Sequence, residues 1–227
     1  MLLTLTLASM ALNAKEAGAG AVTAKEAVAD TVMARAVFAD LPVSTLDLLS
    51  KNTCLDMLDY WDVDSVYRAT NNLKGRSYIR ELTPDFIEVQ LTEVSTLQIK
   101  LLPQRGNTPL IMTVYTVGEE GQPMESDMEF YDSALNPLPK EKFLKAPELK
   151  DFIRIPKGSK MTLKEVEQLL PFFTVAYKTE ASGDGLTATL ELGDILTVEN
   201  SGKVMPLLSP KLSYRWNGKK FQMIKQQ

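Results

Sequence analysis

The sequence contains no histidine among its 227 residues. Histidine is the commonest general base in enzymes, the usual zinc ligand and the side chain that titrates near neutral pH. A Ser-His-Asp or Cys-His mechanism therefore cannot be assembled from this chain alone. The missing residue type argues against most hydrolase mechanisms, and we expect a protein that is not an enzyme.

Cysteine occurs once, as Cys54. A single thiol forms neither an intramolecular disulfide nor a thiolate cage for a metal ion. Cys54 lies within an apolar run, residues 53–58, where a cysteine usually serves as a small buried hydrophobe. We therefore predict that Cys54 is buried, and we expect no metal and no other cofactor.

Motifs for serine catalysis and phosphate binding are also missing. The sequence has no Ser-x-x-Lys and no Gly-x-Ser-x-Gly, the patterns of serine nucleophiles in β-lactamases and α/β-hydrolases. The Gly-rich run 182–185 lacks the lysine of a phosphate-binding loop, and we interpret it as a hairpin turn. Lysine and arginine total 25 against 29 acidic residues, a net charge of −4, so nucleic acid is not an expected partner.

The N-terminal residues resemble a secretory signal peptide. Residues 1–14 hold a short apolar stretch followed by small residues; it has the length of a signal-peptide core and is too short to cross a bilayer. No lysine or arginine precedes it, and a buried N-terminal strand is the alternative. Residues 15–27 are rich in alanine and glycine, which indicates a flexible lead-in. We expect an exported protein, periplasmic or extracellular, without a membrane span.

Hydrophobic periodicity then predicts a first unit of helices followed by antiparallel sheet, residues 28–134. Apolar residues at helical spacing over 28–41 and 46–61 predict two helices, with Pro42 suited to the first turn of the second. Five segments alternate in the manner of antiparallel strands with one solvated face: residues 78–82, 86–91, 97–101, 110–117 and 128–131.

A segment rich in proline and lysine, residues 135–160, is interpreted as a linker to a second unit, residues 161–227. A short helix opens that unit, with Thr162 as its N-cap and Pro171 beyond its end. Four further segments predict strands: residues 173–178, 186–192, 212–216 and 221–224. The pair Asn217-Gly218 favours a type I′ hairpin turn. The predicted fold class is α+β, with N-terminal helices and antiparallel sheet in two tandem units; whether these share one sheet stays open.

From about Val37 onward, the order and spacing of residues resemble an exported Bacteroidales family known as a domain of unknown function. The residues that carry this resemblance are spread along the chain: Leu41-Pro42, 48–52, 55–60, Asn72, Gly75, Ser77, Leu101-Leu102-Pro103, Phe130-Tyr131, Tyr214-x-Trp216-Asn217-Gly218 and Phe221. The resemblance implies an envelope or secreted protein of mixed α and β structure, and it implies no activity. The tandem arrangement is also similar, at the level of the fold, to β-lactamase-inhibitor-like proteins.

Aromatic residues are the strongest candidates for binding. Tyr60, Trp61 and Trp216 form a possible surface for a protein or glycan of the cell envelope, because tyrosine and tryptophan bury a large area and keep a polar atom. Burial in the core is the competing interpretation. Three Asp-Ser/Thr-apolar triplets also resemble O-glycosylation acceptors of exported Bacteroidales proteins, and their acceptor residues are Thr31, Ser65 and Ser133.

Carboxylates supply the alternative function, a carboxylate-based hydrolase that acts on a glycan or peptide. Glu125, Asp127 and Glu129 follow a turn that contains glycine and proline. A glycosidase needs two carboxyl groups at catalytic separation, one of them in an apolar environment, and the sequence shows no such environment. We therefore predict a non-enzymatic envelope binding or protein-interaction module, of unknown partner and oligomeric state.

Overall fold

Two helices open the part of the chain that the structure describes. The structure is a computed structural model, and it describes residues 32–42, 46–63, 67–106, 108–119, 122–193 and 196–224. Helix α2 spans Ala34–Asp40 and helix α3 spans Lys51–Asp62. The predicted signal peptide and lead-in, residues 1–27, lie outside the described residues.

Helix α3 begins later than the leucine spacing predicts, and Pro42 does not open it. Ser50 is the N-cap: its hydroxyl accepts a hydrogen bond from the Thr53 backbone N–H at 3.1 Å, which satisfies a donor that has no partner inside the helix. Residues 46–49 form a turn ahead of this cap. Leu46 and Leu49 matched a helical pattern because both pack into the core from that turn.

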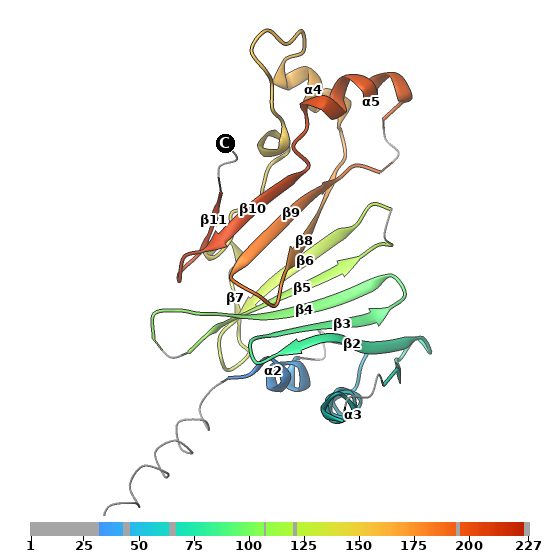
Figure 1. Cartoon of the computed structure of the whole chain (residues 1–227), viewed down its shortest axis with the longest axis vertical. Helices are drawn as coiled ribbons and strands as arrows, with labels where there is room; N and C mark the ends of the chain where they lie inside the picture. The colour runs from blue at the N-terminus through green and yellow to red at the C-terminus, as the bar shows by residue number, and fades with distance from the viewer. Residues whose placement is uncertain are drawn as a thin grey trace, which may run out of the picture. The chain divides into compact units, whose positions relative to one another are not determined.

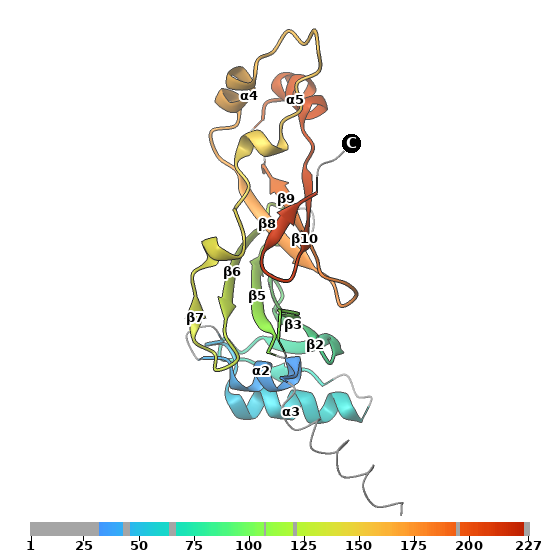
Figure 2. The ribbon, with the colours of Figure 1, turned by 90° about the vertical axis from the view of Figure 1, so that its left-hand side faces the viewer.

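A seven-stranded antiparallel sheet follows α3, and each strand pairs with the next one along the chain. Its strands are β1 (Ala69–Thr70), β2 (Arg76–Thr83), β3 (Phe86–Thr92), β4 (Ser95–Leu102), β5 (Leu110–Val117), β6 (Glu125–Tyr131) and β7 (Pro137–Leu138). Helices α2 and α3 lie side by side against this sheet (Figure 1, Figure 2). The predicted antiparallel sheet after N-terminal helices is confirmed.

A second antiparallel sheet has the strand order β11-β10-β9-β8. Its strands are β8 (Thr174–Thr179), β9 (Gly185–Glu191), β10 (Lys211–Trp216) and β11 (Phe221–Met223). Helix α4 (Leu163–Leu169) precedes it, and the predicted N-cap Thr162 forms a capping box with Glu165. Hydrophobic spacing does not predict helix α5 (Val198–Val204), because Val204 is its one buried residue. The α+β class is confirmed.

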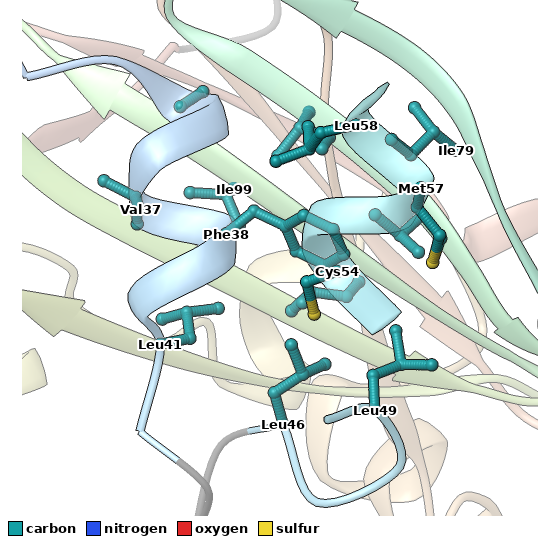
Figure 3. Close-up of a cluster of buried hydrophobic side chains, with 14 of the residues drawn as sticks. Val37, Phe38, Leu41, Leu46, Leu49, Cys54, Met57, Leu58, Ile79 and Ile99 are labelled. Carbon is teal, nitrogen blue, oxygen red and sulfur yellow. The ribbon is translucent and has the colours of Figure 1, made fainter. Parts of the chain in front are cut away.

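One face of the seven-stranded sheet packs against α2 and α3. Phe38 of α2, Met57 of α3 and Ile99 of β4 are almost completely buried together. Figure 3 shows Cys54 among these side chains. Burial raises the pKa of the Cys54 thiol to about 12, so the thiol stays protonated near neutral pH. The predicted role of Cys54 as a small buried hydrophobe is confirmed.

The other face packs against the second sheet, so the two sheets share one core. Phe130 of β6 lies 5.0 Å from Phe143 between ring centroids, and Trp216 of β10 lies 5.2 Å from Phe221 of β11. Phe143 belongs to the segment 135–160, which we predicted to be a linker. That segment also carries β7 and the 3₁₀ helices η1 (Lys140–Lys142) and η2 (Leu149–Phe152). It contributes to the core, and the described residues from Val32 onward form one compact unit.

Polar side chains of the first sheet cover the outer edge of β8. The Gln98 side chain accepts a hydrogen bond from the Thr179 N–H and donates one to the Thr179 carbonyl, both at 3.0 Å. The Ser126 hydroxyl accepts from the Tyr177 N–H at 2.9 Å. Backbone groups paired in this way are closed to another strand, which protects the sheet from edge-to-edge association.

A buried lysine completes this polar contact between the sheets. Lys100 is 1% exposed, and its Nζ donates to the Ala181 carbonyl and to the Asp85 carboxylate, both at 2.8 Å. A buried ammonium group requires such partners, because an unpaired buried charge costs on the order of several kcal/mol.

Candidate binding surface

An exposed group of aromatic side chains lies at the C-terminal end of α3. Tyr60 stacks on Tyr67 with ring centroids 4.2 Å apart and planes inclined by 17°. Tyr60 is 45% exposed, Trp61 36% and Val63 70%. We call these four residues the aromatic surface. The exposed Tyr60 ring is held by the partly buried Tyr67 ring beneath it, and a rigid exposed aromatic ring suits the binding of a protein or a sugar.

Helix α3 is anchored well enough to present this surface. Its inner side buries Cys54, Met57 and Leu58. At its C-terminal end, Asp62 forms an ion pair with Arg35 of α2 at 2.7 Å. This pair is partly exposed and adds at most about 1 kcal/mol, so apolar packing supplies most of the anchoring.

Trp216 does not belong to an exposed surface, which corrects the sequence-based prediction. It is 5% exposed, and its indole N–H donates to the Pro103 carbonyl at 2.6 Å. The alternation of β10 turns Leu212, Tyr214 and Trp216 toward the first sheet, so the competing interpretation as core holds for this residue. Burial also raises the pKa of the Tyr214 hydroxyl well above its ordinary value.

A polar hollow of about 270 Å³ opens on the seven-stranded sheet. Among the described residues, its lining is Leu46, Asp47, Leu48, Leu91, Thr113, Tyr115, Asp127 and Glu129. Asp127 and Glu129 of β6 pair in the ladder with Tyr115 and Thr113 of β5, so all four side chains lie on one face of the sheet. The structure thus brings two of the predicted carboxylates together. Thr113 and Tyr115 were not predicted as site residues, although the two-residue period of β5 places them on the same face.

Both β6 carboxylates of the hollow already have partners. Asp127 forms an ion pair with Lys140 at 3.3 Å, and Glu129 accepts a hydrogen bond from the Tyr131 hydroxyl at 2.5 Å. Both residues are exposed. The hollow is therefore open to solvent and lined by exposed carboxyl groups. Acid catalysis by a carboxyl group near neutral pH calls instead for an apolar enclosure.

Two residues that carry the family resemblance, Asn72 and Gly75, shape the backbone. The Asn72 side chain donates to the Asp47 carbonyl at 2.6 Å, which fixes the loop at the rim of the hollow. Gly75 donates its N–H to Asn71 Oδ1 at 2.9 Å, and a Cβ at Gly75 would lie 3.2 Å from Asn71 Nδ2. A larger residue at position 75 would therefore press on the side chain that holds the turn.

One of the three predicted O-glycosylation acceptors lies within the described residues. Ser133 is exposed in a turn, where the Asp132 carboxylate accepts hydrogen bonds from the backbone N–H groups of Ala134 and Asn136. The hydrogen bonds from Asn136 lower the pKa of Asp132. Thr31 and Ser65 lie outside the described residues, and modification of all three stays a prediction.

The described part of the chain offers neither a cluster of metal ligands nor a membrane-spanning helix. No group of three or more Cys, Asp or Glu side chains there is placed to hold a metal ion. No helix in those same ranges has both the length and the apolar character needed to cross a bilayer.

Comparison with known proteins leads to a family of unknown function. Residues 25–221 match the family described as "Protein of unknown function (DUF3256)". A solved structure, of a domain of an uncharacterized protein from Porphyromonas gingivalis W83, is similar with a TM-score of 0.71 and 21% identity; the match covers 85% of this chain and 98% of that one. No curated protein matches the chain. The predicted resemblance to a domain of unknown function is confirmed, with a similar structure from a Bacteroidales organism. The likeness to β-lactamase-inhibitor-like folds stays a prediction.

Proposed function

Since the chain belongs to the DUF3256 family of proteins of unknown function, we propose that it is a non-enzymatic binding module of the cell envelope, exported to the periplasm or the cell exterior. The observation that carries this proposal is the stack of the exposed Tyr60 on the partly buried Tyr67, beside the exposed Trp61. Aromatic residues of this kind are the side chains most often found at the centre of binding interfaces.

The surroundings of the aromatic surface favour a polar rim around an apolar centre. Asp56 and Asp59 are exposed on the same helix and would meet positively charged or hydroxyl groups of a partner. An interface with an aromatic centre and a charged rim is the usual arrangement in specific complexes. We propose a protein or a glycan of the envelope as the partner.

The test begins with capture of partners from an envelope fraction of the source organism by the full chain, with identification by mass spectrometry. The purified partner is then titrated against the chain and its Tyr60→Ala/Trp61→Ala variant. We expect the variant to bind the partner at least roughly thirtyfold more weakly, since an aromatic residue at the centre of an interface contributes about 2 kcal/mol or more. A matched control is Leu73→Ala/Val117→Ala, which shortens two exposed apolar side chains elsewhere. Equal loss in both double variants, with folding intact, would contradict the proposal.

Export has its own test. We expect the chain to be recovered from the periplasm or medium after removal of about residues 1–14, as measured by fractionation and intact mass. A full-length chain in the cytoplasmic fraction would contradict this part of the proposal and leave the aromatic surface untouched.

A second candidate function rests on the hollow that Asp127 and Glu129 share. A glycosidase uses a pair of carboxyl groups, and these two lie on one face of the sheet. If the chain hydrolyses a glycan or peptide, Glu129→Gln should abolish the activity, whereas Glu125→Gln, a variant of an exposed residue outside the described lining, should keep it. Loss of activity in both variants, or in neither, would exclude this site as the catalytic one.

A further inference from the structure

A positively charged segment lies at the end of the described unit that carries α4 and α5. Residues 153–164 contain Arg154, Lys157, Lys160 and Lys164 and no acidic residue, in a chain whose net charge is −4. All four cationic residues are exposed. In both ribbon views, the loop that leads from η2 into α4 extends past α4 and α5 (Figure 1, Figure 2). We call residues 153–164 the basic segment.

The charge of the basic segment is not neutralised by ion pairs. Within the described residues, none of its four cations has an acidic side chain within ion-pair distance. Three carboxylates flank the segment in the sequence. Asp151 accepts a hydrogen bond from the Glu148 N–H, Glu165 accepts from Thr162 in the capping box, and Glu167 follows Lys164 in α4 without forming an ion pair with it. The segment therefore presents local positive charge on a chain that is acidic overall.

Exposed apolar side chains accompany these cations. Ile155 is 38% exposed and Leu163 39%, and after α4 Phe172 is 75% exposed and Phe173 36%. The helices next to these residues are packed together: α4, α5 and neighbouring residues share a small core of Ile153, Val166, Leu170, Val204 and Leu207. Exposed cations and exposed large apolar side chains thus lie close together in the sequence on both sides of α4, next to a folded core.

We propose that the basic segment, together with Phe172 and Phe173, docks this protein on the surface of a bilayer that contains anionic phospholipid. Lysine and arginine near such a surface are attracted by the phosphate head groups, while phenylalanine and leucine enter the boundary of the acyl chains. A soluble polyanion would attract the same cations, but it offers no apolar region for Ile155 and Leu163. The inference goes beyond the proposed function, because the aromatic surface on α3 takes no part in it.

The test is co-sedimentation of the full chain with vesicles of phosphatidylglycerol mixed with phosphatidylcholine, and with vesicles of phosphatidylcholine alone. We expect binding to the mixed vesicles that weakens as salt is added. The Lys157→Gln/Lys160→Gln variant should bind roughly thirtyfold more weakly, from the usual contribution of a lysine near an anionic surface. Phe172→Ser should weaken binding severalfold. The matched control, Lys219→Gln/Lys220→Gln, removes two exposed charges from the turn between β10 and β11 and should bind as the unmodified chain does.

Three results would overturn the proposal. The first is equal binding to both kinds of vesicle, which would mean that anionic lipid is not required and that apolar contacts alone hold the protein. The second is an equal loss in the two lysine double variants. The third is unchanged binding by Phe172→Ser together with full competition by heparin, which would make the segment a site for soluble polyanions. Lys157→Arg/Lys160→Arg should retain binding and so separates loss of charge from loss of folding. Tyr60→Ala/Trp61→Ala should also bind vesicles normally, so failure of one proposal leaves the other standing.

Discussion

The two sheets meet through two junctions of opposite character. The apolar junction joins Phe130, Phe143, Trp216 and Phe221 in contiguous aromatic contacts. The polar junction joins Gln98, Lys100 and Ser126 of the first sheet to the backbone of β8 and of the turn that follows it. Both lie between the same two sheets, yet one depends on filled volume and the other on directed hydrogen bonds.

The difference indicates that one junction holds the sheets together and the other orients them. Apolar burial contributes in proportion to area and tolerates small shifts. Hydrogen bonds to a strand edge contribute less in net stability, but they are costly when one partner is removed and the other stays buried. We infer that the apolar junction supplies most of the stability and that the polar junction fixes the position of β8.

The largest expected effect comes from the apolar junction. Trp216→Ala should reduce the free energy of unfolding by about 3–5 kcal/mol, the usual cost of deleting a large buried ring. Trp216→Phe keeps much of the volume but loses the bond to the Pro103 carbonyl, and should cost about 1–2 kcal/mol. Urea unfolding followed by circular dichroism measures both.

Lys219→Ala, in an exposed turn, is the control for this measurement and should change stability by less than about 0.5 kcal/mol. A cost below about 1 kcal/mol for Trp216→Ala would mean that the second sheet does not depend on the aromatic contacts, since deletion of a buried ring ordinarily costs several times more.

A smaller effect should follow from breaking the polar junction. Gln98→Met keeps the length of the side chain but leaves the buried Thr179 N–H and carbonyl without their partner. We expect a loss of roughly 1–3 kcal/mol and faster hydrogen exchange at the Thr179 amide, with slower-exchanging amides of β9 little changed. Native-state exchange measured by NMR reports both.

The informative comparison for that variant is Ser126→Ala, which should speed exchange at the Tyr177 amide and not at Thr179. Uniform acceleration along the whole of β8 in both variants would show that the edge opens as one unit, and that single side chains do not protect single amides.

Much of the fold could be predicted from the sequence because strand alternation and turn residues are local signals. The segments 86–91 and 110–117 matched β3 and β5, and Thr162 was recognised as the N-cap of α4. The start of α3 was missed because leucines in a buried turn have the same spacing as leucines on a helix. The nature of residues 135–160 was missed because Phe152 is buried, and Phe143 partly buried, against strands that lie far away in the sequence.

The candidate site was predicted less completely, for a physical reason. Tyr60 and Trp216 are both aromatic residues near charged neighbours, and composition does not distinguish them. Their exposure is decided by what lies opposite: solvent for Tyr60, and the first sheet with the Pro103 carbonyl for Trp216. The shared hollow of Asp127 and Glu129 likewise depends on the loop at Asp47, which the Asn72 side chain brings to the sheet.

The smallest expected effect concerns the charged part of the polar junction. Burial acts to raise the pKa of Asp85, but hydrogen bonds from Lys100 and Thr83 outweigh it, so the pKa of this carboxyl is lowered on folding. Because unfolded aspartate titrates near pH ~4, the resulting stability is present above that pH. It is lost as the pH falls through the lowered pKa of the folded state.

Asp85→Asn removes this titration but keeps a side-chain oxygen that can accept from the buried Lys100 Nζ, which also retains the Ala181 carbonyl. It should therefore reduce stability near neutral pH by only about 1 kcal/mol, because the charge that is lost is half exposed to solvent. The difference between the variant and the unmodified chain should shrink as urea unfolding is repeated toward pH ~3, where the pair contributes less. Glu93→Gln, at an exposed turn, should show no such convergence. A difference that stays constant or grows with acidification would mean that Asp85 acts through packing, and that the polar junction orients β8 without help from its charge.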